Sequence, residues 1–192
     1  MIRWVGKGLL AIIALFYMTS IANSQLYIQA GLNASSQRAK FNGINIDSER
    51  KPGYHAGLFS NIQLVRQLSL QPGILYSSKG LAGRDAISSF NYIEVPANLH
   101  YRFSENEGAF IEAGFYFAML ISAKSQGYNV SDDAHLEDFG GNFGVGYHFR
   151  KISIGLRANQ GLINIARVRQ TVIGEVTNYN MNAMLYFTKK IF

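Results

Sequence analysis

Six ionisable residues occupy polar positions in segments where apolar and polar residues alternate: Glu94, His100, Arg102, Glu112, His148 and Arg157. Carboxyl and imidazole groups can act as general acids and bases. The same groups, when buried, must find partners of opposite charge or hydrogen bonds. A short turn over residues 104–108 would place Glu112 about opposite His100, with Arg102 one pair away. The spacing therefore fits either an acid–base or proton-transfer site or a set of mutual ion pairs.

The rest of the sequence favours mutual ion pairing over catalysis. The chain has no cysteine, which excludes a disulfide framework, a thiolate metal site and a cysteine nucleophile. No Ser–His–acid order and no metal-ligand spacing accompanies the six residues. We therefore expect a polar plug that replaces a hydrophobic core, and we predict that Glu112→Ala leaves unpaired cations and destabilises the protein.

Residues 91–103 show most clearly what kind of element positions these side chains. Ile93, Val95, Ala97, Leu99, Tyr101 and Phe103 fall on one side, whereas Tyr92, Glu94, Pro96, Asn98, His100 and Arg102 fall on the other. A helix would mix the two sets around its circumference, so the period of two predicts a strand.

Eight such segments follow one another, and the connections between them alternate in length. The long connections are residues 33–53, 77–89, 122–138 and 162–177, and short ones include 104–108 and 150–151. Short periplasmic turns and long outer loops are typical of membrane barrels. The pattern predicts an all-β, eight-stranded antiparallel up-and-down transmembrane β-barrel with both termini in the periplasm. Pro72 and Pro96 fall inside strands, where we expect bulges.

The ends of the chain and its composition fit export to an outer membrane. Residues 1–24 have the basic, apolar and small-residue regions of a cleavable signal peptide, which leaves a barrel domain over residues 25–192. An uncleaved anchor helix is the alternative. Loss of two basic residues would lower the net charge from +6 to +4, too mild for a nucleic-acid surface. Charged residues make up only 16% of the chain, which suits a surface facing lipid.

Aromatic residues form two predicted girdles on the outward face. Tyr54, Tyr76 and Tyr179 fall at the outer ends of the strands, and Tyr101, Phe103, Tyr147, Phe149 and Phe187 fall at the periplasmic ends. Amphipathic rings prefer the two membrane interfaces. A soluble eight-stranded barrel would instead turn its apolar residues inward. The pattern therefore indicates the outer membrane of a Gram-negative bacterium.

Two proline-containing motifs carry a family resemblance. Residues 68–76 followed by Gly80, and residues 92–96 followed by 101–103, resemble signatures of the Bacteroidetes outer-membrane β-barrel family, described as porin-like or PorT-like. Residues 112–114 and 138–147 resemble its later strands. The resemblance implies an eight-stranded barrel of the OmpA or OmpX sort, with prolines tolerated inside strands and no assigned activity for most members. Members usually end on an aromatic residue that corresponds to Phe187, whereas this sequence continues to Phe192. Either Phe187 or Phe192 would then be the terminal aromatic residue that the barrel-assembly machinery recognises.

The function expected from these features is structural or interactive, without a cofactor. We expect a non-enzymatic outer-membrane barrel with a plugged lumen, contacting membrane lipid and lipopolysaccharide and, through its outer loops, a protein partner. An accessory subunit of a secretion or assembly system is one alternative. A lipid A-modifying enzyme is another, for which His55 and His135, beside Ser and Asp residues of the outer loops, would be the best-placed histidines.

One acidic loop could bind calcium. Asp132, Asp133, Glu137 and Asp138 lie close together in the connection of residues 122–138. Their spacing does not match an EF-hand loop, so a solvated loop is favoured over a calcium site.

Overall fold

The computed structural model describes residues 25–41, 44–47, 49–82, 87–125, 128–129, 137–163, 170–171 and 174–191. Eight long strands make up this part of the chain: β1 (Gln25–Phe41), β3 (Glu49–Val65), β4 (Leu68–Ala82), β5 (Ile87–Arg102), β6 (Gly108–Ser125), β8 (Glu137–Phe149), β9 (Ile152–Gly161) and β11 (Gly174–Lys190). Three short strands extend them: β2 (Ile44–Asp47), β7 (Tyr128–Asn129) and β10 (Gln170–Thr171). The predicted signal peptide lies outside the described residues.

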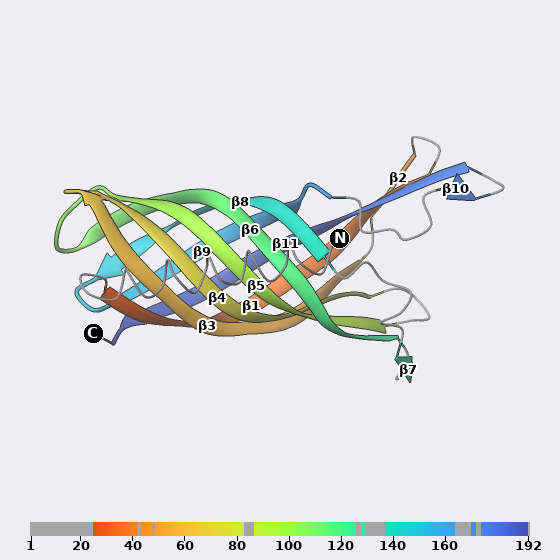
Figure 1. Ribbon diagram of the computed structural model, residues 1–192, viewed down its shortest axis with the longest axis horizontal. Helices are drawn as coiled ribbons and strands as arrows, with labels where there is room; N and C mark the ends of the chain where they lie inside the picture. Colours follow the sequence, from red (N-terminus) through yellow and green to blue (C-terminus); the bar gives the residue numbers. More distant parts are fainter. Residues whose placement is uncertain are drawn as a thin grey trace, which may run out of the picture.

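The long strands form a closed barrel in chain order (Figure 1). Each pairs antiparallel with the next, and β11 pairs with β1 from Tyr27 opposite Lys190 to Phe41 opposite Val176. The predicted eight-stranded antiparallel up-and-down barrel is therefore confirmed. Within the described ranges, no helix is long and apolar enough to cross a membrane.

The two ends of the barrel differ in the length of their connections. Residues 66–67, 103–107 and 150–151 make tight turns at one end, which we call the turn end and which also holds the C-terminal residues (Figure 1). We call the opposite end the loop end. Most long strands have 13–18 residues, although 9–11 suffice to cross a bilayer. The strands thus continue into segments that we had predicted as long loops, because ladder pairing persists where the apolar alternation has stopped.

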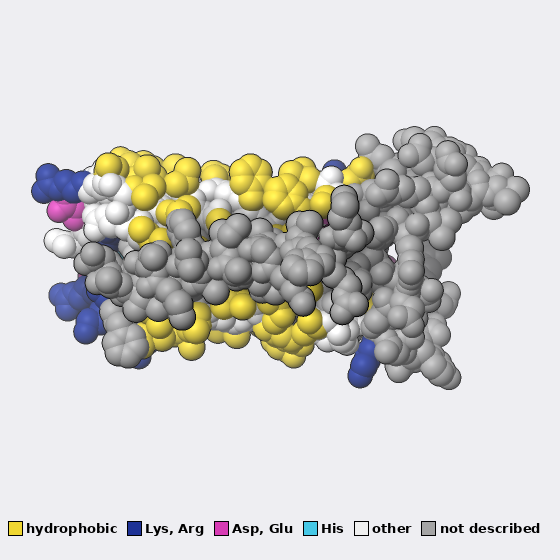
Figure 2. Space-filling view, in the orientation of Figure 1, with side chains coloured by type: hydrophobic (Ala, Val, Ile, Leu, Met, Phe, Trp, Pro, Cys, Tyr) yellow, Lys and Arg dark blue, Asp and Glu magenta, His cyan; other side chains and the backbone are white. Residues whose placement is uncertain are grey.

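The barrel is apolar outside and polar inside. Leu99, Phe143 and Leu156 point outward and are 49–58% exposed, while Asn98, between Ala97 and Leu99 on β5, is fully buried. Exposed apolar side chains come from all eight long strands and form a belt, and Figure 2 shows the part of it on the face in view, with basic side chains at the turn end. This arrangement reverses that of a water-soluble barrel and suits a surface facing lipid.

Neither Pro72 nor Pro96 coincides with a bulge, contrary to our prediction, although a register shift on β3 does span Pro52. Register shifts lie between Arg50 and His55 and between Gln63 and Val65 on β3, and between Asn91 and Tyr92 on β5. Pro72 stays in register with Ala97, and Pro96 with Tyr116. Proline has a φ compatible with extended backbone, so its missing N–H removes a ladder hydrogen bond without inserting a residue.

Candidate functional site

A buried ion pair lies in the lumen, in the half of the barrel nearer the turn end. Arg157 of β9 donates from Nε to Oε1 of Glu112 on β6 at 2.7 Å and from Nη2 to Oε2 at 3.1 Å. The Tyr186 hydroxyl donates to Oε1 at 2.9 Å, and His100 Nδ1 lies 3.8 Å from Oε2. Both charged side chains are almost fully buried. We call Glu112, Arg157, Tyr186 and His100 the Glu112 cluster.

Strand register and one glycine bring this cluster together. The row of paired positions runs from His100 to Glu112, Gly144 and Arg157, which confirms that Glu112 lies opposite His100. A Cβ atom at Gly144 would approach Cγ of Glu112 to 2.8 Å. Glycine therefore leaves the space through which the Glu112 carboxylate reaches Arg157 on the second strand along.

A second ion pair lies nearer the loop end. Lys79 Nζ of β4 is 2.6 Å from Glu94 Oε1 on β5, and both side chains are almost fully buried. The ammonium also lies 5.3 Å and 5.0 Å from the ring centroids of Tyr92 and Tyr116, within range of cation–π attraction. The Tyr116 hydroxyl in turn donates to Asp138 Oδ2 at 3.2 Å. We call these five residues the Lys79 cluster.

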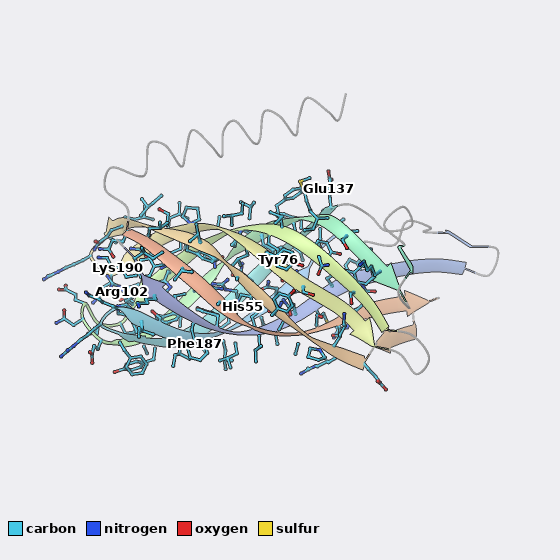
Figure 3. All side chains as sticks on the ribbon, turned by 90° about the horizontal axis from the view of Figure 1, so that it is seen from below. His55, Tyr76, Arg102, Glu137, Phe187 and Lys190 are labelled. Atoms are coloured by element: carbon cyan, nitrogen blue, oxygen red, sulfur yellow. The ribbon has the colours of Figure 1, made fainter. Side chains whose placement is uncertain are left out.

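Neutral polar side chains inside the lumen also bond to one another between neighbouring or next-neighbouring strands. His55 Nδ1 lies 2.6 Å from Asn33 Oδ1, and Asn33 Nδ2 donates to Ser77 Oγ at 3.1 Å. Asn142 Nδ2 donates to Asn98 Oδ1 at 2.9 Å. His55 is 1% exposed and points from β3 into the lumen (Figure 3).

Arg102 and His148 lie at the turn end, apart from the Glu112 cluster. Arg102 Nη1 donates to the Glu105 carbonyl at 3.5 Å, a long hydrogen bond, and His148 Nδ1 lies 2.8 Å from Ser153 Oγ. Neither contacts Glu112 in the described part of the chain. The six predicted lumen residues thus lie at three levels along the barrel. Glu94 belongs to the Lys79 cluster, the Glu112 cluster holds three of the others, and Arg102 and His148 lie at the turn end.

Sequence reasoning missed five members of these clusters: Lys79, Asp138, Tyr92, Tyr116 and Tyr186. We had placed Lys79 and Asp138 in outer loops. Leu75, Ser77 and Lys79 all point inward. Extending the alternation of this strand beyond Tyr76 would have identified Lys79 as a lumen residue. The three tyrosines were missed because only charged and amide side chains were considered as partners.

The calcium hypothesis is not supported for the residues that can be placed. Asp138 is fully buried in the lumen, where Tyr116 and Asn180 both donate to Oδ2, whereas Glu137 is exposed (Figure 3). Asp132 and Asp133 lie outside the described residues, as does His135. Among the described ranges, no group of three His, Asp or Glu side chains could hold a metal ion.

The predicted girdle residues with described side chains lie on the outward face. Ring pairs form between Tyr54 and Tyr76, with centroids 6.0 Å apart, between Tyr101 and Phe103 at 5.3 Å, and between Tyr147 and Phe149 at 4.5 Å. Phe187 is exposed near the turn end (Figure 3), and Tyr179 is half-buried on β11. Their contact with the membrane interfaces stays a prediction, and Phe192 lies outside the described residues.

A family comparison gives the barrel its context. Residues 21–167 match the family model described as "Outer membrane protein beta-barrel domain". The chain belongs to this family. Its location is accordingly the outer membrane of a Gram-negative bacterium. The finer resemblance to porin-like and PorT-like proteins of Bacteroidetes stays a prediction.

Solved structures of outer-membrane proteins share the fold of this family member. Neisserial surface protein A is similar with a TM-score of 0.53 and 13% identity, covering 86% of this chain and 97% of that protein. OprG from Pseudomonas aeruginosa is similar with a TM-score of 0.50 and 10% identity, covering 88% and 96%. The outer-membrane enzyme PagL has a TM-score of 0.47 and 17% identity, covering 83% and 99%. The search of curated proteins finds no match.

Proposed function

We propose that the protein is a non-enzymatic outer-membrane barrel whose lumen is plugged and whose loop end carries its interactions. The observation that carries this proposal is the pair of buried salt bridges, Glu112–Arg157 and Lys79–Glu94. The first joins β6 to β9, two strands along the wall, and the second joins the adjacent strands β4 and β5. Together with the hydrogen bonds between them, they fill the lumen with fixed side chains.

A plugged lumen argues against a porin. Eight strands enclose an interior that side chains can fill, whereas open channels have sixteen or more strands. An ion crossing this lumen would have to separate the Glu112–Arg157 pair, which is held by two hydrogen bonds. Breaking a buried pair without a replacement partner is costly. We therefore expect no large conductance.

The polar contacts also argue against an enzyme of the lipid A-modifying kind. Among the described residues, the closest approach to a nucleophile and its base is the Ser153–His148 pair at the turn end. A catalytic histidine of this kind needs a third group to orient it. In the described part of the chain no carboxylate forms an ion pair with His148, and the pair lies at the end away from the extended strands.

The loop end is where recognition is expected. There β1 continues to Phe41 and β11 begins at Gly174, so the paired strands project past the apolar belt (Figure 1). Rigid paired strands that project from the bilayer can hold binding loops in place. Lipopolysaccharide, other cells or a protein partner could be contacted there, and the accessory-subunit alternative uses the same surface.

Three measurements test the proposal. The refolded protein in a planar bilayer should give no conductance steps comparable to those of large porins; such steps would refute the plugged lumen. Cross-linking in native outer membranes, followed by affinity purification, should recover the barrel with lipid. A single stoichiometric protein partner would instead support the accessory subunit. Lipid A that changes in mass when the gene is deleted would contradict the non-enzymatic proposal.

A further inference from the structure

A cavity of about 30 Å³ lies in the lumen between the Glu112 cluster and the turn end. Residues from all eight long strands line it, and it opens toward a wider mouth between the turns. Arg102, Arg157, His100, His148 and Gln29 are among the lining residues. We call this space the turn-end cup. No aspartate or glutamate is among the residues lining the cup, although Glu105 and Glu107 lie at the mouth.

The walls of the cup present hydrogen-bond donors. Gln29 is 1% exposed, and its Nε2 has no hydrogen-bond partner. A buried N–H group without an acceptor is costly, so an acceptor at this position would be favourable. Arg102 uses one recorded hydrogen bond, to the Glu105 carbonyl at 3.5 Å, and its guanidinium has further N–H groups. The imidazoles of His100 and His148 can donate from one nitrogen, or from both when protonated.

The mouth of the cup is basic. Arg150 and Lys190 line the mouth, Arg66, Lys151 and Lys189 lie outside it at the same end, and Figure 3 shows Arg102 and Lys190 at this end. The two glutamates at the mouth are occupied: Glu105 pairs with Arg66, and Glu107 pairs with Arg150 at 3.4 Å. Basic side chains around a cleft raise the local concentration of anions.

We propose that the turn-end cup binds the oxyanion group, a carboxylate or a phosphate, of a ligand that enters from the turn end. A cavity of this size holds about two water molecules, so only the head of a charged group fits, and the remainder of the ligand would lie in the mouth. Arg102 supplies the unneutralised charge, since Arg157 is already paired with Glu112. This binding site does not depend on the proposed interactions at the loop end.

The direct test is titration of the whole mature barrel with simple anions. The barrel, refolded in detergent micelles and labelled with 15N at histidine, would be titrated with inorganic phosphate and with acetate at constant ionic strength, with sodium chloride as the reference. We expect the signals of His100 and His148 to shift and saturate with at least one oxyanion, while the His55 signal stays unchanged. Shifts that never saturate, or that sodium chloride reproduces, would overturn the proposal.

A pair of charge variants separates the cup from the general charge of this end. Arg102→Gln should weaken oxyanion binding about tenfold or more, because a hydrogen bond to a charged group is lost. Lys151→Gln removes the same charge at the same end but lies outside the cup and its mouth, so binding should change less than about twofold. Equal weakening by both variants would refute the cup as the site. Gln29→Met, which removes the buried amide donor, should also weaken binding.

Discussion

The Glu112–Arg157 pair offers the sharpest test of the plug. In Arg157→Met, Glu112 Oε1 would keep the Tyr186 hydroxyl, while Oε2 would keep only His100 at 3.8 Å. Removing one member of a buried pair costs about 3–5 kcal/mol, because the other charge is left in a poorly solvated site. We therefore expect Arg157→Met to lower the free energy of unfolding by about that amount.

A double variant distinguishes lost pairing from lost packing. In Glu112→Gln/Arg157→Met no charge is left behind, so the double variant should recover about 2–3 kcal/mol relative to the sum of the single changes. The control is Arg150→Met, which breaks the Arg150–Glu107 pair, whose arginine side chain is 90% exposed. An exposed pair contributes about 0–1 kcal/mol.

The assay is reversible unfolding in urea of the barrel in detergent or lipid vesicles. The only tryptophan is Trp4, in the predicted signal peptide, so the mature chain has to be followed by far-UV circular dichroism rather than by tryptophan emission. A loss below about 1 kcal/mol in Arg157→Met, or full additivity in the double variant, would refute the argument that a buried ion pair closes the lumen.

The remaining predictions concern the second ion pair and the lipid face. Lys79→Met should cost about 3–5 kcal/mol by leaving Glu94 unpaired, and a change within error of wild type in the same assay would show that Lys79 is not needed. Leu156→Arg, in the middle of β9 on the outward face, should cost about 2–4 kcal/mol, whereas Leu162→Arg at the loop end should cost about 0–1. Equal costs at the two leucines would contradict a bilayer centred on the apolar belt.

Much of the fold could be predicted because one face of each strand is apolar. The alternation over residues 91–103 fixed which side chains of β5 point inward, and the short turn after Arg102 then set Glu112 opposite His100. Turn length determines register in a hairpin, so this pairing needed no knowledge of the other strands.

The composition of the site could be predicted less well than the fold. Glu112 pairs with Arg157 across β8, and this partnership depends on Gly144 leaving space between them. Nothing in the local pattern of β6 or β9 shows which glycine faces which charge. Lys79 and Asp138 were missed for a different reason: they lie on strand segments whose outward neighbours are no longer consistently apolar.

The pairing of β1 with β11 has a consequence for the order of assembly. Tyr27 pairs with Lys190, so the seam of the cylinder joins the first and last strands of the domain. Until the final strand has been synthesised, any partly formed sheet has two open edges, whose N–H and C=O groups cannot be left bare in hydrocarbon. Closure of the barrel is therefore a late event that requires nearly the whole polypeptide. A chain that terminates before β11 should be unable to form a closed barrel in a bilayer.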